Sequence, residues 1–185
     1  MTQPPTAVRS VRAEEIVAAA RELLETQGPG ALTMRAVADA LGIRAPSIYK
    51  HLPDKHALEV AILEQGMAEM GEVLRRALAD AGPGPGAIEA LLRAYRSEAL
   101  GHPNLYRLAT VGPLPRDELT PGLEEWAGEP FFSATHDPYA AQALWSFAHG
   151  MVILEIDGRF PGPGELDRTW SAGAAAFAAA VGPPG

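Results

Sequence analysis

The sequence predicts an all-helical protein of about nine helices, and three observations support this fold class. Apolar residues recur at intervals of three and four rather than two along most of the chain. Runs of Pro and Gly, such as residues 82–86 and 161–164, separate the periodic segments. The hydrophobic fraction of 47% in 185 residues is large enough to form a core.

The first third of the chain contains three predicted helices. The first covers about residues 10–27 and turns Ile16, Ala20 and Leu24 to one side. The second covers about residues 33–41, with Thr33 as its N-cap.

A short third helix follows a glycine turn. Gly42 occupies a position typical of a helix stop, and Pro46 suits the first turn of a helix over about residues 45–51. Asp54 then caps a helix over about residues 55–81, long enough at about 40 Å to join two domains. Further helices are predicted at about residues 86–101, 103–111, 117–127, 138–157 and 164–181.

Charge is distributed unevenly along the chain. The net charge is −8, yet residues 1–56 hold seven Lys and Arg against six Asp and Glu. The remaining residues hold eight against seventeen. The first third is therefore the part of the chain that can approach a phosphate backbone without strong repulsion.

Residues 33–55, TMRAVADALGIRAPSIYKHLPDK, combine two short helices with a tight glycine-containing turn. Such a turn places the second helix where it can enter a DNA major groove. Ile48 and Leu52 are spaced by four and anchor this helix to a core. The polar side chains between them are hydrogen-bond donors suited to bases and phosphates.

This segment resembles the TetR family of bacterial repressors. The family spacing is matched by Thr33, Val37, Ala38, Gly42, Ile43, Ile48, Tyr49, His51, Leu52 and Lys55. Leu52 departs from the pattern, which usually has Phe at that step. The resemblance covers residues 9–60.

The resemblance implies a DNA-binding role for nine residues. Thr33, Tyr49 and Lys55 are expected to contact phosphates, and His51 to contact either phosphates or bases. The base edges are expected to face Arg44, Ala45, Pro46, Ser47 and Lys50. The structural alternative is that Tyr49 and His51 only cap a three-helix core.

A second, shorter resemblance lies near the C-terminus. Trp145, His149 and Gly150 resemble the C-terminal domain of a TetR subset named for its Trp-His-Gly signature, and Glu155 fits the continuation of that signature. This resemblance implies that the helix at 138–157 lines a ligand cavity and joins a dimer-forming four-helix bundle.

The last predicted helix is rich in alanine and glycine, which allow helices to approach closely. We expect Gly150, Ala174 and Phe177 at a dimer interface. A dimer also agrees with the DNA interpretation, because a two-fold assembly reads a palindrome. Burial within one subunit is the alternative.

The large side chains of the C-terminal region, with few polar groups among them, suit a small hydrophobic effector. The preferred pocket residues are Tyr95, Tyr106, Trp126, Trp145 and His149. These aromatic residues can equally fill the core, and His149 can instead lie at the dimer interface or bond within the core.

Other function classes lack support. The chain has no cysteine and no phosphate-loop, hydrolase or zinc-protease motif, so neither an enzyme nor a cofactor is predicted. No two of the five histidines have metal-ligand spacing, so no metal site is predicted. Without a signal peptide or membrane span, a cytoplasmic location is expected.

We therefore expect residues 1–56 to form a helix-turn-helix DNA-binding domain, and residues 57–185 a ligand-binding and dimerisation domain. The expected partners are double-stranded DNA, a small-molecule effector and a second copy of the chain. The expected function is transcriptional repression at a palindromic operator, released by a small hydrophobic ligand. The alternative is an all-helical binding or interaction module without DNA activity.

Overall fold

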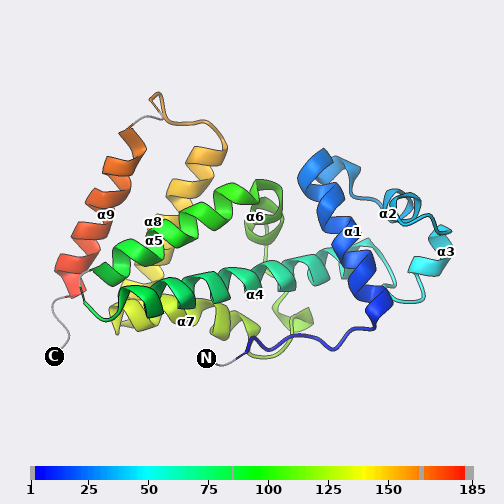
Figure 1. Ribbon diagram of the computed structural model, residues 1–185, viewed down its shortest axis with the longest axis horizontal. Coiled ribbons are helices and arrows are strands. Elements are labelled where there is room, and N and C mark those ends of the chain that lie inside the picture. The colour runs from blue at the N-terminus through cyan, green and yellow to red at the C-terminus, as the bar shows by residue number, and fades with distance from the viewer. Residues whose placement is uncertain (1–2, 85, 163–164, 182–185) are drawn as a thin grey trace. The chain divides into compact units, whose positions relative to one another are not determined.

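A computed structural model describes residues 3–84, 86–162 and 165–181. All regular secondary structure in these residues is helical, with nine α-helices and two single turns of 3-10 helix (Figure 1). The all-helical prediction is therefore confirmed. By sequence, the elements are α1 (Val11–Gln27), η1 (Pro29–Ala31), α2 (Met34–Ala40), α3 (Ala45–Ile48), α4 (Lys55–Ala81), α5 (Gly86–Gly101), α6 (Pro103–Thr110), η2 (Arg116–Glu118), α7 (Leu123–Thr135), α8 (Pro138–Ile156) and α9 (Leu166–Val181).

The chain forms two compact units. Unit 1 contains Met1–Ala68 and His102–Glu124, and unit 2 contains Glu69–Gly101 and Glu125–Gly185. Helix α4 contributes residues to both. The expected functional boundary at residue 56 is a different kind of division and stays a prediction. Among the described residues, none of the helices has the length and apolar character needed to cross a membrane.

Unit 1 has an apolar core made by five helices. Ile16, Val37, Ile48 and Ile62, from α1, α2, α3 and α4, are fully buried in one cluster, and Leu105 of α6 joins them. The fully buried positions of α1 and α2 follow the helical spacing that the sequence predicts.

Helix α6 is also tied to α1 by hydrogen bonds. The Glu25 carboxylate accepts from the backbone N–H of Leu105 at 2.7 Å. The Asn104 side-chain amide donates to the Glu25 carbonyl oxygen at 3.2 Å. Unit 1 is therefore assembled from two stretches of sequence separated by α5.

Local sequence signals set the helix ends in unit 1. The side chains of Ser10, Thr33 and Asp54 accept hydrogen bonds from backbone N–H groups in the first turns of α1, α2 and α4. Gly42 lies between α2 and α3 with φ +64°, a left-handed conformation that glycine adopts without strain. The caps at Thr33 and Asp54 and the turn at Gly42 agree with the sequence-based expectation.

The predicted helix at residues 117–127 is wrong. The chain there forms the single turn η2, leaves the helical conformation, and starts α7 at Leu123. Pro121 lacks a backbone N–H, and Gly122 has φ +82°, so this pair interrupts a helix. Helix α7 then continues to Thr135, eight residues beyond the predicted end.

Other helix boundaries differ by less. Helix α3 ends at Ile48 rather than residue 51, because the backbone N–H groups of both His51 and Leu52 donate to the Ile48 carbonyl oxygen and close a turn. Helix α9 begins at Leu166, and residue 164, where it was predicted to begin, lies outside the described residues.

Unit 2 is organised by the packing of α5 against α8 and α9. The ring of Phe147 on α8 lies over Gly173 of α9, where a Cβ atom would collide with the ring. The same ring meets Trp170 and Phe177 at centroid distances of 5.7 Å. Small residues in the last helix therefore permit close packing inside one subunit.

A polar junction also links these three helices. Arg96 of α5 donates to Glu155 of α8 at 3.0 Å and to Asp167 of α9 at 2.6 Å. The indole N–H of Trp170 donates to the same Glu155 carboxylate. Glu155, 7% exposed, is thus compensated by two donors.

Candidate functional site

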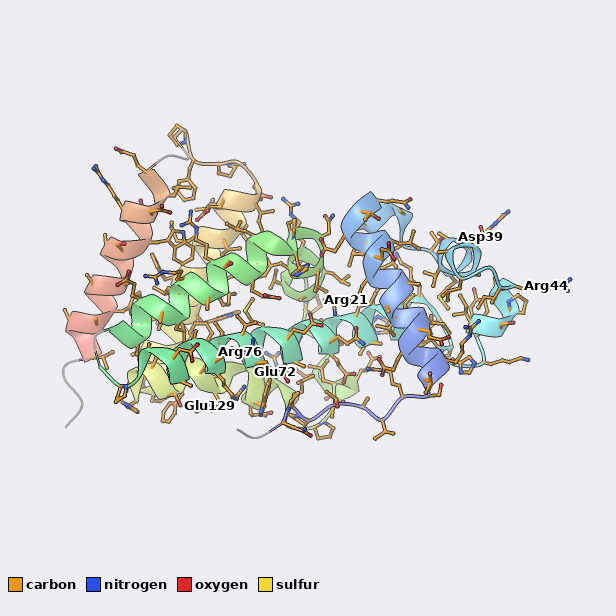
Figure 2. All side chains as sticks on the ribbon, in the orientation of Figure 1. Arg21, Asp39, Arg44, Glu72, Arg76 and Glu129 are labelled. Atoms are coloured by element: carbon orange, nitrogen blue, oxygen red, sulfur yellow. The ribbon has the colours of Figure 1, made fainter. Side chains whose placement is uncertain are left out.

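The nine residues expected to contact DNA all lie in unit 1, at the start of α2, on α3 and the following turn, and at the start of α4. Seven are exposed: Thr33, Arg44, Pro46, Tyr49, Lys50, His51 and Lys55. Ala45 and Ser47 are half-buried. Figure 2 shows the Arg44 side chain extending outward from the start of α3.

The anchoring residues of the same segment face the opposite way. Ile48 is fully buried and Leu52 is 6% exposed, while Tyr49 between them is 50% exposed. Burial of Ile48 and Leu52 therefore leaves Tyr49, Lys50 and His51, in the turn between them, facing solvent. This arrangement gives the segment a donor-rich surface on a rigid support.

Two residues at the start of α4 have acidic partners. Lys55 forms an ion pair with Glu59 at 3.2 Å, one helical turn away. His56 Nε2 lies 2.8 Å from a Glu118 carboxylate oxygen, and this hydrogen bond raises the pKa of His56 above 6.5. The start of α4 is therefore joined to η2.

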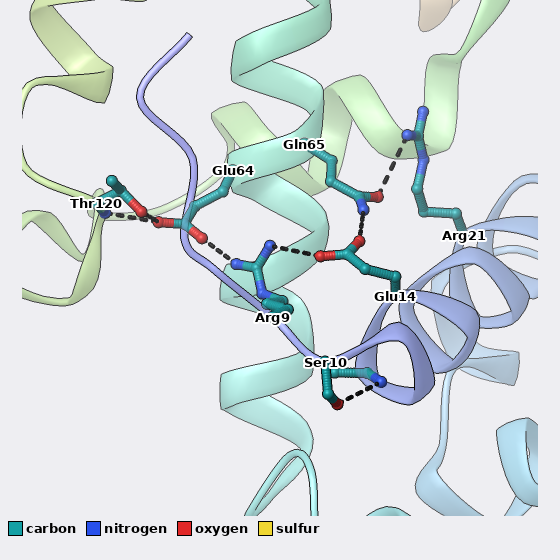
Figure 3. Close-up of polar contacts among 8 residues, drawn as sticks. Arg9, Ser10, Glu14, Arg21, Glu64, Gln65 and Thr120 are labelled. Atoms are coloured by element: carbon teal, nitrogen blue, oxygen red, sulfur yellow. Dashed lines mark hydrogen bonds and ion pairs between the residues drawn. The ribbon is translucent and has the colours of Figure 1, made fainter.

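A buried carboxylate connects three separate segments of unit 1 (Figure 3). Glu64 of α4 is 3% exposed. It accepts from the backbone N–H and the hydroxyl of Thr120 at 2.6 and 2.7 Å, and it pairs with Arg9. Both carboxylate oxygens therefore have donors, and the cation of Arg9 compensates the buried charge. Arg9 in turn fixes the segment that leads into α1.

The candidate ligand residues fall in different places. Tyr106 belongs to unit 1, and Tyr95, Trp126, Trp145 and His149 belong to unit 2. Tyr95 is buried and meets Phe131 of α7 edge to face at 5.7 Å. Trp145 is 44% exposed and stacks on His149 at 5.7 Å. The structure thus brings Trp145 and His149 together and gives Tyr95 a different aromatic partner.

Trp126 has an unusual polar environment. Its indole Nε1 is buried and has no hydrogen-bond partner among the described residues. Its ring lies over Gly71 of α4, where a Cβ would collide with it, and the Arg75 guanidinium lies 3.7 Å from the ring centroid. An unpaired buried donor is the kind of group that a ligand acceptor can satisfy.

Arg75 also donates a hydrogen bond to the backbone of α7. Pro130 lies inside this helix and has no N–H to donate to the carbonyl oxygen of Trp126, four residues earlier. The Arg75 guanidinium donates to that carbonyl oxygen instead and pairs with Glu129 at 3.3 Å. Arg75 therefore positions Trp126 through both its backbone and its ring.

The residues expected at a dimer interface differ in exposure. Gly150 on α8 and Phe177 on α9 are half-buried, and Ala174 is 5% exposed within unit 2. The exposed alanines of α9 are Ala172, Ala175, Ala176, Ala179 and Ala180. Their spacing puts them on one face of the helix.

The sequence did not predict three residues that contact or support the candidate site. Arg75, Glu64 and Ser10 act through contacts that span 41 or more residues of sequence. Pro130 within a helical pattern was the one local signal, since it implies an unpaired carbonyl one turn earlier. Burial lowers the pKa of His149 below 6.5, which a sequence pattern does not reveal.

No group of three or more His, Cys, Asp or Glu side chains in the part of the chain that the structure describes could hold a metal ion. The polar clusters described above pair carboxylates with arginines, which stabilises packing.

Comparison with known proteins identifies two family profiles along the chain. Residues 16–62 match the bacterial regulatory proteins of the tetR family. Residues 88–177 match the tetracyclin repressor-like C-terminal domain, a range that includes Trp145, His149 and Gly150.

Curated and solved relatives agree with these profiles. The chain is 32% identical over 158 residues to the uncharacterized HTH-type transcriptional regulator Rv0681 of Mycobacterium tuberculosis, covering 78% of this chain and 70% of the relative. A Rhodococcus sp. RHA1 protein of unknown function has a similar fold, with TM-score 0.79, 22% identity and coverage of 93% and 96% of the two chains.

The multidrug binding protein EbrR, solved with imidazole, also shares the fold, with TM-score 0.70, 22% identity and coverage of 95% and 98%. The profiles and the Mycobacterium relative together show that this chain belongs to the TetR family of helix-turn-helix transcriptional regulators.

Proposed function

We propose that this regulator is a repressor that binds a palindromic operator as a homodimer and leaves it when a small hydrophobic ligand binds. In this proposal, residues 1–56 contact DNA, and residues 57–185 bind the ligand and the second subunit. The observation that carries the proposal is the surface around α3. Seven of the nine expected contact residues are exposed, while Ile48 and Leu52 anchor the same segment in the core.

The chemistry of that surface favours DNA. Arg44, Lys50 and Lys55 supply positive charge, and Tyr49 and His51 supply further donors for phosphate oxygens. Ala45 and Pro46 add little bulk where α3 begins, which allows close approach to base edges.

The dimer proposal is supported by α8 and α9. The exposed alanine face of α9 can pack closely against a second helix, and Trp145 of α8 exposes 44% of its surface. An exposed apolar face of this kind favours association in water. A two-fold assembly would place two recognition helices on one palindromic operator.

The ligand proposal is supported by Trp126 and its neighbours. A buried indole N–H without a partner among the described residues would donate to an acceptor on an otherwise apolar ligand. The structural relative EbrR is a multidrug binding protein, which is consistent with an effector of this class. Ligand binding would lower operator affinity only if it favours one conformation of the protein over another.

The DNA proposal is tested by fluorescence anisotropy on duplexes from upstream of the protein's own gene, at two salt concentrations. Binding should weaken steeply as salt rises, because phosphate contacts release counterions. Tyr49→Ala should weaken it about tenfold. Tyr139→Ala, which removes an 80% exposed tyrosine from α8, is the matched control and should leave the affinity unchanged.

Absence of binding to those duplexes and to fragmented genomic DNA, after extraction of any bound ligand, would support the alternative of a binding module without DNA activity.

The dimer is tested separately by light scattering. Ala176→Arg should shift the particle toward the mass of one chain, whereas Arg93→Ala, at an exposed position of α5, should not.

A further inference from the structure

Ser10 lies at the start of α1 and contacts a residue beyond the recognition helix. Its hydroxyl oxygen accepts the backbone N–H of Ala13 at 3.2 Å, which makes Ser10 the N-cap of α1 (Figure 3). The same oxygen lies 3.3 Å from Nδ1 of His51, 41 residues further along the chain. One hydroxyl group thus joins the first helix to the turn that follows α3.

The hydroxyl can serve both partners at once. A serine hydroxyl has two acceptor lone pairs and one hydrogen. The Ala13 N–H uses one lone pair, and the hydroxyl hydrogen can donate to Nδ1 of His51. A neutral imidazole that accepts at Nδ1 carries its proton on Nε2. If the ring is charged, Nδ1–H donates to the second lone pair of Ser10 and Nε2–H is retained.

Nε2 is the ring nitrogen that does not face Ser10, and in the arrangement where Ser10 donates to Nδ1 it bears a hydrogen in both protonation states. The His51 side chain is exposed, and its neighbours Tyr49 and Lys50 are exposed as well. A phosphate oxygen is a pure acceptor and needs such a donor. The alternative tautomer, with the proton on Nδ1, would present a lone pair to the phosphate and repel it.

We propose that Ser10 is a positioning residue that fixes the orientation and tautomer of His51, so that its Nε2–H donates to the DNA backbone. The inference rests on the proposed DNA-binding function and adds to it a residue outside the helix-turn-helix segment. Ser10 acts through His51 and does not itself contact DNA. It also couples the beginning of α1 to the recognition surface, since one side chain caps the former and orients the latter.

The first test examines the free protein and needs no DNA. Long-range ¹H–¹⁵N NMR spectra at pH 8 should show His51 in the Nε2–H form, with Nδ1 as the acceptor. Ser10→Thr keeps the hydroxyl and should preserve this form. Ser10→Gly removes the hydroxyl at little cost to helix capping, and should move the nitrogen shifts toward those of a solvated ring. A solvated ring already present in the unchanged protein would overturn the proposal.

The second test uses a DNA duplex that the unchanged protein recovers from a random-sequence pool. In His51→Gln the amide nitrogen occupies the place of Nε2, and in His51→Asn that of Nδ1. We expect His51→Gln to retain DNA affinity and His51→Asn to lose about tenfold. The reverse order would contradict the assignment of Nε2 to the phosphate.

A double-mutant cycle separates positioning from capping. Ser10→Gly should weaken DNA binding about threefold in the unchanged background and have no further effect when His51 is replaced by Ala. An equal loss in both backgrounds would show that Ser10 acts only as a cap and would overturn the proposal. Circular dichroism confirms that each variant is folded.

The proposed function and the role of Ser10 fail in distinguishable ways. If the unchanged protein recovers no duplex at all, the proposed function fails and the phosphate contact of His51 fails with it. If the protein binds DNA but the cycle shows no coupling, the proposed function stands and the role of Ser10 is rejected.

Discussion

Unit 1 and unit 2 differ in the burial and the hydrogen bonding of their aromatic and polar side chains. In unit 1 the core cluster contains no aromatic residue and is built by α1 to α4 and α6, while Tyr49 is exposed. In unit 2 large aromatic side chains remain in contact with solvent, including Phe132 at 47% and Trp145 at 44% exposure. Trp126 there keeps a buried donor without a partner among the described residues.

The two units differ in their exposed aromatic side chains, which are Tyr49 in unit 1 and Phe132, Tyr139 and Trp145 in unit 2. The core cluster of unit 1 is closed by its own helices, although Val8, Val11 and Val111 are exposed outside it, and the unit presents a set of donors around α3. Unit 2 leaves apolar surface and hydrogen-bonding capacity that a ligand or a second subunit can use. A regulator needs both, because one unit must hold its shape while the other responds.

The largest expected effect comes from the core of unit 1. Ile48→Ala leaves a cavity where a fully buried side chain had packed, and should lower the free energy of unfolding by about 2–5 kcal/mol. Leu154→Ala, at a 40% exposed position of α8, should change it by about 0.5 kcal/mol or less. Urea denaturation followed by circular dichroism measures both, and equal losses would remove the contrast between the units.

The second effect concerns the hydrogen bond from Arg75 to the backbone of α7. Arg75→Met leaves the Trp126 carbonyl oxygen without its donor and should cost about 2 kcal/mol of unfolding free energy. In a Pro130→Ala background the cost should be smaller, because the introduced alanine supplies the missing backbone N–H. Arg93→Met, which breaks an exposed pair with Glu89, is the control and should cost under about 1 kcal/mol. If Arg75→Met costs the same unfolding free energy in the Pro130→Ala background, Arg75 does not replace the lost backbone donor.

A smaller effect is expected at the buried carboxylate of unit 1. Thr120→Val keeps the shape of the side chain but removes one of the donors to Glu64, and should cost about 1 kcal/mol. The exposed Thr26, whose hydroxyl donates to the Glu22 carbonyl oxygen, provides the matched Thr26→Val control. Thermal unfolding compares the two variants, and the control should change little because water replaces its bond.

The smallest effect is a contrast in pH dependence. Burial lowers the pKa of His149 in the folded protein, so the unfolded chain takes up the proton more readily. Stability should therefore fall as the pH drops from 6.5 through the folded pKa, and His149→Gln should remove this loss. Its neighbour Trp145 is uncharged, so desolvation is the cause that the variant tests.

His56 should behave in the opposite sense. Its hydrogen bond to Glu118 raises its pKa in the folded protein, so its stabilisation is fully present below pH 6.5 and disappears as the pH rises through the folded pKa. Melting temperatures of the unchanged protein, His149→Gln and His56→Gln from pH 5.5 to 8 measure both signs. The same pH profile in all three proteins would contradict both assignments.

The two units also differ in how far the sequence predicts them. The caps at Thr33 and Asp54, the turn at Gly42 and the four-residue spacing of the buried Ile48 and Leu52 involve residues within one or two helical turns of each other. Such short-range signals are visible in a sequence. For that reason the helix-turn-helix segment and the family could be predicted from the N-terminal third.

The interior of unit 2 depends on contacts between distant residues. Trp126 packs on Gly71 and Arg75, 51 or more residues away, and the carbonyl oxygen that Pro130 leaves without a backbone donor accepts from the distant Arg75 guanidinium. A proline and a glycine near residue 121 produced the wrong helix limits for the same segment. Which aromatic residues meet a ligand stays a prediction, because their packing is set by tertiary contacts.

The discontinuity of unit 1 has a consequence for its synthesis on the ribosome. Leu105 of α6 belongs to the core cluster around α1, and its backbone N–H donates a hydrogen bond to Glu25. Glu64 accepts a hydrogen bond from Thr120, which is synthesised later still. All of α5 is translated between these partners. A nascent chain therefore finishes its DNA-facing unit only after the first helix of the other unit has emerged, and folding cannot proceed strictly from the N-terminus. Until α6 has been synthesised, part of the apolar surface of α1 and α4 stays exposed. We expect a chaperone to assist folding most at this stage.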